Sequence, residues 1–317
     1  MKIMHYKILF AGSGEFAADI FKKMAASEFR PMAVITQPDK LIGRHQVLSP
    51  SAVKVVAQKL DIKVHEPKSL KNSTAEKMIR DLEPDLLVVA DYGKIIPENI
   101  LRVPKFGALN IHPSLLPRHR GASPIQYTIL EGDKKTGVTI ILMDKEVDHG
   151  SIVAISELKI EISSLTHSEL LKKLADLGGD LLIKTLPKWL DREIKPLPQD
   201  ESKVTYTKIL TREDGKINWQ ESAEKIERQI RALEGWPGTW CIWPEENKKI
   251  KISHAEILEN DLSGPAGKVL SSSDGEMLIV VNKGVLKINE VQLEGKNKIT
   301  GREFLRGYPK ILNAILS

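Results

Sequence analysis

The first half of the chain alternates short, nearly continuous apolar runs with longer amphipathic stretches. Such runs are typical of parallel strands covered on both faces, and the amphipathic stretches are typical of the helices that cover them. The pattern therefore predicts a Rossmann-like open α/β sheet. The predicted strands are Tyr6–Ala11, Met32–Thr36, Asp85–Ala90, Gly107–His112, Gly137–Met143 and Ser151–Ile160. The predicted helices are Glu15–Ala26, Ser51–Leu60, Ser123–Leu130 and Ser168–Trp189, with Ser49 and Pro50 opening the second of them.

The pattern changes after the last of these helices. Residues 191–207 are polar and contain prolines without any period, which predicts a linker. A helix over Ser222–Leu233 is then followed by short strand candidates separated by Gly, Ser and Asn. We therefore expect a first domain over residues 1–190 and a smaller β-barrel, OB-like domain over residues 208–317. The strand candidates of the second domain are Lys249–Ala255, Gly267–Ser271, Met277–Val281 and Val285–Val291.

Composition supports two domains, because 317 residues with 41% hydrophobic content exceed what one ordinary core supports. The single cysteine, Cys241, excludes a disulfide framework and a cysteine-rich metal site. It fits a reducing compartment, so we expect a cytoplasmic protein. The sequence has no signal-peptide pattern and no apolar run of membrane length, so we expect neither secretion nor a membrane partner. The net charge of +5 permits an anionic partner, but neither half is a basic domain.

A glycine cluster after the first strand supports a rival hypothesis. Gly12, Gly14 and Ala17 match the permissive G-x-G-x-x-G/A spacing of dinucleotide-binding proteins. However, the second strand does not end in the acid that would bind the ribose hydroxyls, and Asp39 lies beyond a proline. Glu15 would also repel a pyrophosphate. A nicotinamide-dependent dehydrogenase is therefore an alternative from another class, while simple turn chemistry explains the glycines as well.

Residues Gly43–Pro50 are predicted to form a long loop between the second strand and the second helix. Loops of this length in compact domains are often binding loops, and Arg44 beside a glycine could reach a phosphate or a base. The alternative is an ordinary arginine that faces solvent.

The densest group of polar residues begins at the end of the strand Gly107–His112. Asn110 and His112 point to the same face of that strand, roughly 7 Å apart. They lie at its carboxyl end, where open α/β sheets place their ligands. An amide beside an imidazole is suited to stabilising a developing oxyanion. Asp148 follows the next strand in an acidic turn, so its carboxylate could reach the same crevice and favour a protonated His112.

Other interpretations of these residues stay open on spacing alone. A strand-end turn with local hydrogen bonds explains Asn110 and His112 as well as catalysis does. His112, His119, Asp148 and His149 could hold a metal, but no i, i+4 or His-x-His pairing preorganises them, so we expect none. Ser114 has no glycines of a nucleophile elbow around it, which disfavours an acyl-enzyme.

At these residues the chain resembles the formyltransferase family. The catalytic strand and loop of that family read N-x-H, then S-L-L-P, and later an aspartate beside a glycine-bearing turn. The resemblance is strongest to members that act on methionyl-tRNA, and it extends over both domains. The matching segments include Phe10-Ala11-Gly12, Thr36-Gln37-Pro38-Asp39, Gly43-Arg44, Asn110-Ile111-His112, Ser114-Leu115-Leu116-Pro117, Asp148-His149-Gly150, Thr205-Tyr206, Ile217-Asn218-Trp219 and Trp236-Pro237-Gly238-Thr239.

The resemblance implies transfer of the formyl group of 10-formyltetrahydrofolate to the α-amino group of methionine on initiator tRNA. It implies that Asn110, His112 and Asp148 are catalytic, that Ser114, Leu115, Leu116 and Pro117 bind folate, and that Arg44 contacts tRNA. The first domain would hold folate and chemistry, and the β-rich domain would help to hold tRNA. We expect a monomer without a metal. His119 and His149 depart from the family pattern, which commonly has tryptophan and threonine there.

Two further alternatives remain. One is a formyltransferase or hydrolase that acts on another substrate, such as a nucleotide sugar or a purine precursor. The second domain disfavours the purine-pathway members, and a sugar enzyme would keep the same three residues. An RNA-binding module without enzymatic activity would use only the β-rich domain, and replacing Asp148 by Asn would then have no effect.

Overall fold

A computed structural model describes residues 6–42, 46–159, 161, 163–258 and 262–317. The chain forms two compact units. The first consists of Met1–Pro124, Lys135–Ile160 and Leu170–Lys208, and the second of Ile125–Lys134, Glu161–Glu169 and Ile209–Ser317. Each unit is therefore assembled from segments that are discontinuous in the sequence. None of the described helices is both long enough and apolar enough to cross a membrane.

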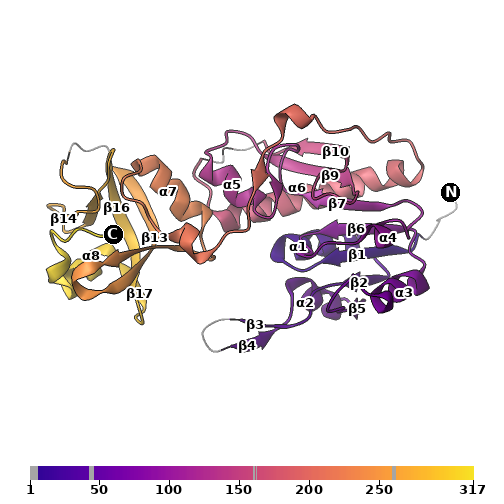
Figure 1. The fold of residues 1–317 in the computed structure, drawn as a ribbon, viewed down its shortest axis with the longest axis horizontal. Helices are drawn as coiled ribbons and strands as arrows, with labels where there is room; N and C mark the ends of the chain where they lie inside the picture. The colour runs from indigo at the N-terminus through magenta and orange to yellow at the C-terminus, as the bar shows by residue number, and fades with distance from the viewer. Residues whose placement is uncertain (1–5, 43–45, 160, 162, 259–261) are drawn as a thin grey trace. The chain divides into compact units, whose positions relative to one another are not determined.

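The first unit is built on a seven-stranded sheet (Figure 1) with the order β10-β9-β7-β6-β1-β2-β5. The central strands are parallel, whereas β9 runs antiparallel to β7 and β10 runs antiparallel to β9. The bounds are β1 Ile8–Gly12, β2 Ala33–Ile35, β5 Lys63–His65, β6 Leu86–Ala90, β7 Ala108–His112, β9 Gly137–Leu142 and β10 Ser151–Glu157. Every residue of β1 and β6 is buried, as their apolar sequences predict. The predicted open α/β sheet is confirmed.

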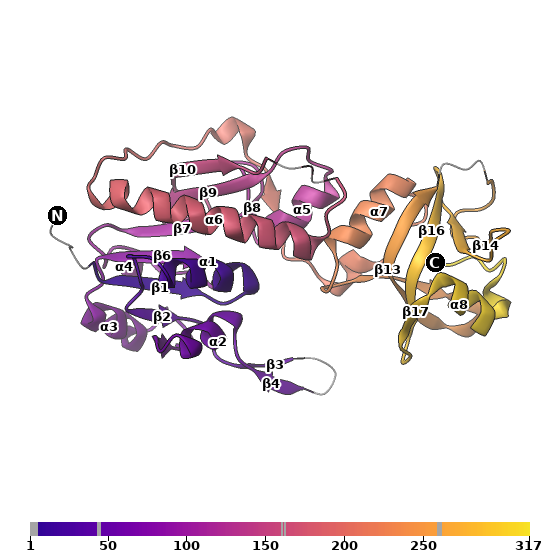
Figure 2. The same ribbon diagram turned by 180° about the vertical axis from the view of Figure 1, so that it is seen from behind.

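Helices cover both faces of this sheet. These helices are α1 Glu15–Ala25, α2 Ala52–Lys59, α3 Ser73–Leu82, α4 Glu98–Leu101 and α6 His167–Leu190. α5 (Pro124–Leu130) belongs to the second unit from Ile125 onward. On one face, α6 runs beside α1 (Figure 2), and a Cβ added to Gly178 would lie 3.1 Å from Ile111 Cγ2 and 3.3 Å from Ile20 Cδ1. On the other face, Ile79 of α3 and Ile100 of α4 pack in one cluster with strand residues such as Leu87. The strand that ends at His112 is thus fixed between two layers.

The segment before α2 differs from the predicted loop. β3 (Lys40–Ile42) and β4 (Val47–Ser49) pair as an antiparallel hairpin, in which Lys40 lies opposite Ser49. The helix begins at Ala52, and the hydroxyl of Ser51 accepts a hydrogen bond from the backbone N–H of Lys54. The prediction that Ser49 and Pro50 open this helix was therefore wrong, because Ser49 is the last residue of a strand and Ser51 is the cap.

Residues 191–207, predicted as a linker, pack along the first unit. Leu197 forms an antiparallel bridge with Ile152, and a short 3₁₀-helix follows at Glu201–Lys203. β11 (Tyr206–Thr207) then pairs in parallel with β8 (Arg120–Gly121). This return segment, residues 191–208, brings side chains to the loop that follows β7.

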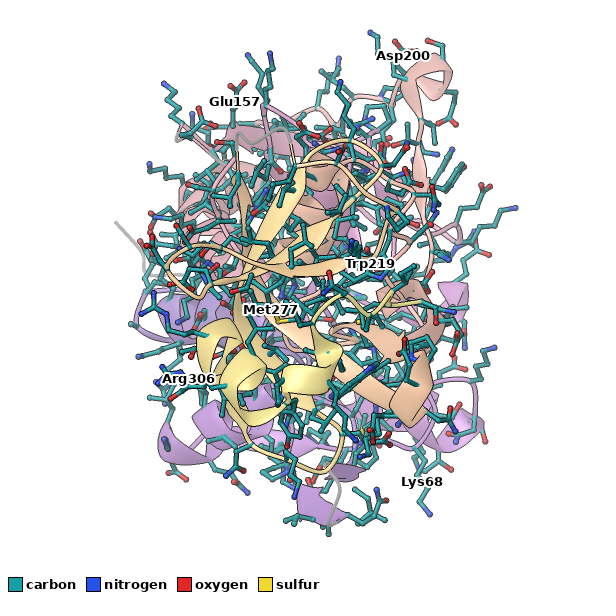
Figure 3. All side chains as sticks on the ribbon, turned by 90° about the vertical axis from the view of Figure 1, so that its left-hand side faces the viewer. Lys68, Glu157, Asp200, Trp219, Met277 and Arg306 are labelled. Carbon is teal, nitrogen blue, oxygen red and sulfur yellow. The ribbon has the colours of Figure 1, made fainter. Side chains whose placement is uncertain are left out.

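The second unit is an antiparallel sheet with the order β12-β13-β16-β15-β14, and β17 pairs with β16. Its elements are β12 Thr239–Trp243, β13 Lys248–Leu258, β14 Val269–Ser271, β15 Met277–Val280, β16 Val285–Leu293, β17 Lys298–Thr300, α7 Ala223–Ala232 and α8 Gly301–Gly307. Register shifts near His254 interrupt the pairing of β13 with β16, and such bulges bend a sheet. The sheet curls into a half-barrel around buried residues such as Met277 and Trp219, whereas Arg306 of α8 is exposed (Figure 3).

Two additional segments complete this unit. Arg228 of α7 donates from Nε to the carbonyl oxygen of Leu130 at 3.1 Å, and Arg231 donates from Nη1 to that of Leu165 at 2.7 Å. The two arginines therefore connect α7 to the segments 125–134 and 161–169, which are distant from it in the sequence. The described part of this unit also contains 3₁₀-helices at Arg212–Gly215, Pro244–Glu246 and Pro309–Ile311.

Candidate active site

The first part of the site is the carboxyl end of β7. β7 lies between β6 and β9, with Asn110 opposite Val89 and His112 opposite Thr139. Alternate residues of a strand face the same side, so Asn110 and His112 share one face. His112 is buried and Asn110 is half-buried. The strand pairing therefore fixes both side chains from the backbone, and the prediction that they lie side by side is confirmed by their shared contact with Asp148.

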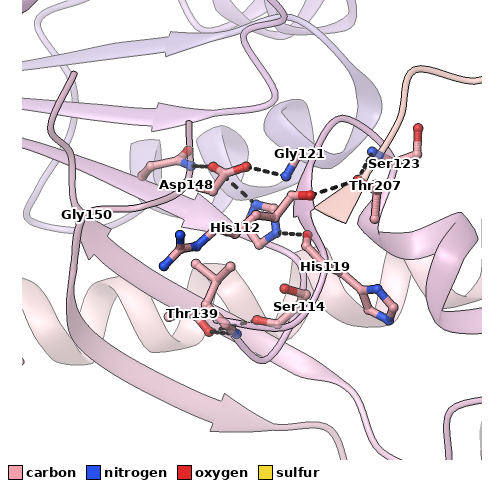
Figure 4. Close-up of polar contacts among 12 residues, drawn as sticks. His112, Ser114, His119, Gly121, Ser123, Thr139, Asp148, Gly150 and Thr207 are labelled. Carbon is pink, nitrogen blue, oxygen red and sulfur yellow. Dashed lines mark hydrogen bonds and ion pairs between the residues drawn. The ribbon is translucent and has the colours of Figure 1, made fainter. Parts of the chain in front are cut away.

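Asp148 stands on the turn after β9, with φ of 52°, in the left-handed region that residues other than glycine seldom adopt. Its Oδ1 accepts a hydrogen bond from Asn110 Nδ2 at 3.2 Å and lies 3.5 Å from His112 Nδ1. Its Oδ2 accepts a hydrogen bond from the backbone N–H of Gly121 at 2.9 Å. Figure 4 shows the carboxylate at the centre of these contacts. The structure thus brings the three predicted catalytic residues together.

His112 has a second polar partner, the backbone carbonyl of His119 in the loop that follows β7. His112 Nε2 lies 2.9 Å from the carbonyl oxygen of His119. A carbonyl oxygen can only accept, so Nε2 carries a hydrogen and donates it. The other nitrogen, Nδ1, lies 3.5 Å from Oδ1 of Asp148. The imidazole of His112 is therefore held between the carbonyl oxygen of His119 and the carboxylate of Asp148.

The predicted folate segment lies in the loop directly after His112. Ser114 is buried, and its hydroxyl donates to the carbonyl oxygen of Arg118 at 2.7 Å. The buried hydroxyl of Thr139 donates to Ser114 O at 2.7 Å and accepts from Leu116 N at 3.1 Å. Leu116 is buried and precedes Pro117 through a cis peptide bond, while Leu115 and Pro117 are half-buried. Thr139 therefore ties the backbone of this loop to β9.

The other residues singled out in the sequence lie in different surroundings. Arg44, the predicted tRNA contact, lies outside the described residues. His119 is buried, and its backbone N–H donates to Thr205 Oγ1 at 2.9 Å. His149 Nδ1 lies 2.6 Å from Asp144 Oδ2, and the hydrogen bond to Asp144 raises the pKa of His149 above its usual value. His119 thus closes the loop over His112, and His149 closes the turn that carries Asp148.

The glycine cluster after β1 is part of a tight packing arrangement. Ser13 donates its backbone N–H to Asp91 O at 3.0 Å, and a Cβ on Gly14 would lie 1.8 Å from Asp91 Oδ2. A pyrophosphate at the start of α1 would meet this carboxylate and that of Glu15. Close packing explains the glycine at position 14, and the two negative charges disfavour a nicotinamide dinucleotide.

The sequence did not reveal three backbone and side-chain contributors to the site. They are the N–H of Gly121, the carbonyl of His119 and the hydroxyl of Thr139. The backbone groups carry no side-chain signal, and Thr139 reads as one more β-branched residue of a strand. Among the residues that the structure describes, no three His, Cys, Asp or Glu side chains are grouped so that they could hold a metal ion.

Both halves of the sequence match family models. The model described as formyl transferase matches residues 4–186, and the one described as formyl transferase, C-terminal domain, matches residues 209–309. The methionyl-tRNA formyltransferase of Caldicellulosiruptor saccharolyticus is 40% identical over 314 residues, which cover 98% of this chain and 99% of that protein. The methionyl-tRNA formyltransferase of Rickettsia bellii is 41% identical over 302 residues, which cover 95% of this chain and 97% of that protein.

Solved structures share the fold. A sugar 3N-formyl transferase, WlaRD, determined in the presence of dTDP and 5-N-formyl-THF, matches with a TM-score of 0.65 and 22% identity. The match covers 93% of this chain and all of WlaRD, at 100%. HypX from Aquifex aeolicus in complex with tetrahydrofolic acid matches with a TM-score of 0.64 and 17% identity, over 98% of this chain and 48% of HypX.

Proposed function

The chain belongs to the formyl transferase family, and on that premise we propose that it formylates the methionine of initiator methionyl-tRNA. The observation that carries this function is the identity of 39–41% with methionyl-tRNA formyltransferases over 95–98% of the chain. The enzyme is therefore a one-carbon transferase of translation initiation. Its formyl donor is a folate, for which we propose 10-formyltetrahydrofolate. We also propose that the enzyme is a cytoplasmic monomer.

The proposed reaction starts when the neutral α-amine of methionine attacks the formyl carbon of the folate. The N–C bond forms, the carbonyl oxygen becomes an oxyanion, and the nitrogen gains a positive charge. Asp148 accepts a proton from that nitrogen and returns it to the folate nitrogen as the C–N bond to folate breaks. The products are formylated methionine on tRNA and tetrahydrofolate, so the proton count is unchanged at the end.

The contacts of the site support these roles. Asn110 Nδ2 carries two hydrogens, of which one is donated to Asp148, so the other is available to an oxyanion. His112 donates from Nε2 to His119 and faces Oδ1 of Asp148 with Nδ1, and we propose that its imidazole is the second group that stabilises this oxyanion. Asp148 accepts from Gly121 and Asn110, and a carboxylate has lone pairs left for the substrate proton.

The substrates are proposed to bind to separate parts of the chain. We propose that the Ser114–Pro117 loop binds the folate, because it follows His112 directly and is tied to β9 by Thr139. We propose a catalytic domain over residues 1–190, a connection over 191–207, and a C-terminal domain over 208–317 that helps to hold tRNA. Arg44 is proposed to contact the acceptor end of tRNA.

The decisive assay supplies the purified protein with 10-formyltetrahydrofolate and either initiator or elongator methionyl-tRNA. We expect formylation of the initiator species and little of the elongator, with Asp148→Asn as the inactive control. Transfer no greater than that of Asp148→Asn would overturn the function. Formylation of an amino sugar nucleotide in place of tRNA would reassign the substrate within the family.

The tRNA contact is tested in the same assay. Arg44→Ala should raise the KM for tRNA about tenfold, since one lost charged contact is worth about 1.4 kcal/mol or more. The KM for folate should stay unchanged, and the salt dependence of tRNA use should weaken. Lys59→Ala, an exposed cation at the end of α2, is the matched control. Equal losses for both substrates would argue against an acceptor-end contact.

A further inference from the structure

The backbone of Asp148 requires support from its surroundings. With φ of 52° it adopts the left-handed conformation, which residues other than glycine seldom adopt and which the surrounding structure must hold in place. The bonds to its carboxylate, from Asn110 and Gly121, orient the side chain but do not hold the backbone. Some other group must therefore fix the turn itself.

Gln199 of the return segment holds the turn. Its Nε2 donates to the carbonyl oxygen of Asp148 at 2.7 Å and to that of Gly150 at 2.8 Å. Both amide hydrogens of Gln199 are used on these two carbonyls, which lie on either side of His149. The turn is also closely packed against the end of β9, since a Cβ on Gly150 would lie 2.0 Å from Leu142 O. The turn is thus held between β9 and one glutamine side chain.

Arg120 fixes the orientation of that glutamine. Gln199 Oε1 accepts from Arg120 Nε at 3.0 Å and from Arg120 Nη2 at 2.9 Å. Because a guanidinium can only donate, the amide oxygen must face Arg120 and the amide nitrogen must face the turn. Arg120 is 1% exposed, which is rare for a charged residue, and its charge is balanced by Glu201, whose Oε1 lies 2.6 Å from Nη2. The burial opposes the charge, but the hydrogen bonds to Glu201 and Tyr206 raise the pKa of Arg120.

Arg120 is also connected to Asp148 through its neighbour in β8, Gly121. Gly121, next to Arg120, donates its N–H to Asp148 Oδ2. β8, which contains both residues, is anchored by the return segment, because Arg120 N donates to Thr205 O at 2.9 Å and Thr207 Oγ1 donates to Arg120 O at 3.2 Å. The carboxylate and the backbone of Asp148 are therefore located by one connected set of bonds.

We propose that Gln199 and Arg120 are positioning residues for the reaction, which act by holding the turn that presents Asp148 to the substrate. This role rests on the proposed function, because it assigns the two residues to the reaction through Asp148. Gln199 has used its oxygen and both amide hydrogens on Arg120, Asp148 and Gly150, so it takes no part in proton transfer itself.

The test is Gln199→Glu, which preserves the size of the side chain and its acceptor for Arg120. It replaces both donors with an oxygen that faces the carbonyls of Asp148 and Gly150. We expect kcat to fall about 100-fold, the loss associated with a displacement of about 1 Å, while KM for folate and tRNA stays within about twofold. Asp200→Asn is the matched control, since the neighbouring Asp200 side chain bonds to Ser202 and Lys203, within three residues of itself.

A double-mutant cycle separates positioning from general structural damage. In the Asp148→Asn background, Gln199→Glu should change the residual single-turnover rate by less than about twofold, because its route to the reaction is gone. Equal losses in both backgrounds would overturn the proposal, as would a raised KM with unchanged kcat. If Gln199→Glu does not fold, Arg120→Lys serves instead, since it keeps the charge beside Glu201 but loses the fork on Gln199. A wild-type protein without formylation activity would overturn the function, whereas an active wild type with an equally active Gln199→Glu would overturn only the positioning role.

Discussion

Asn110 and His112 stand on a strand, whereas Asp148 stands on a turn, and the two regions are stabilised in different ways. β7 is bonded to β6 on one side and to β9 on the other, so ordinary sheet pairing places its two side chains. The turn after β9 has a strained backbone and depends on a glutamine 51 residues away in the sequence. Residues on a strand are placed by local periodicity, whereas the residue on the turn is placed by tertiary contacts alone.

The largest expected effect is at the turn. Asp148→Asn should lower kcat by about 10²–10⁴-fold, because an amide cannot accept the substrate proton. The asparagine NH₂ would also face donors on Asn110 or His112. Single-turnover formylation measures the loss, and Asp191→Asn, at an exposed site after α6, serves as the control. A loss below tenfold would remove Asp148 from the proposed chemistry.

The next effect is at the strand. Asn110→Ala should lower kcat by about 10²–10³-fold, the usual cost of one lost oxyanion donor. The backbone of β7 should stay in place, because its pairing with β6 and β9 does not involve this side chain. Thermal unfolding of the variant should therefore match that of the wild type. A large fall in melting temperature would contradict the view that the strand end is fixed independently of its side chains.

A smaller effect is expected where the strand supports the folate loop. Thr139→Val keeps the side-chain shape but leaves the N–H of Leu116 and the carbonyl of Ser114 without their buried partner. The free energy of unfolding should fall by about 1–3 kcal/mol, and the KM for folate should rise. Urea denaturation and steady-state kinetics measure these two quantities. Thr139→Ser, which retains the hydroxyl, should preserve the KM; a raised KM there would point to packing in place of hydrogen bonding.

The smallest expected effect is a pH-dependent change in stability from the pair His149 and Asp144. The hydrogen bond to Asp144 raises the pKa of His149, so this pair stabilises the fold fully below about pH 6.5, the usual pKa of histidine. The contribution is lost as the pH rises through the raised pKa. Because both side chains are partly exposed, at 38% and 41%, it should stay below about 1 kcal/mol. His149→Gln should therefore be slightly less stable than the wild type at pH 5.5, and the two proteins should converge at pH 9; a gap that widens with pH would contradict this assignment.

The strand end and the turn also differ in how well the sequence predicts them. The buried strands could be predicted because near-continuous apolar runs such as Leu86–Ala90 mark them directly. The shared face of Asn110 and His112 follows from the period of two along a strand. The hairpin β3–β4 could not be predicted, because strands of three residues are too short to show apolar alternation.

The support of Asp148 could not be predicted for another reason. Gln199 lies in a polar stretch with prolines that reads as a linker, and its partner Arg120 is 79 residues away. Nothing local distinguishes this glutamine from an exposed one, and a buried arginine within a basic loop reads as a solvent-facing charge. The sequence pointed to a carboxylate from this turn, but the backbone conformation of Asp148 and the bonds that hold it depend on tertiary structure.

The distance between Asp148 and Gln199 also sets an order of events on the ribosome. The chain is synthesised from its N-terminus at about 5–20 residues per second, so Gln199, 51 residues downstream, follows Asp148 after about 3 to 10 seconds. During that interval the strand that carries Asn110 and His112, β7, has already been made, but the glutamine that holds the turn has not yet been added. The last strand of the sheet, β10, is therefore synthesised before the glutamine that holds the turn of Asp148.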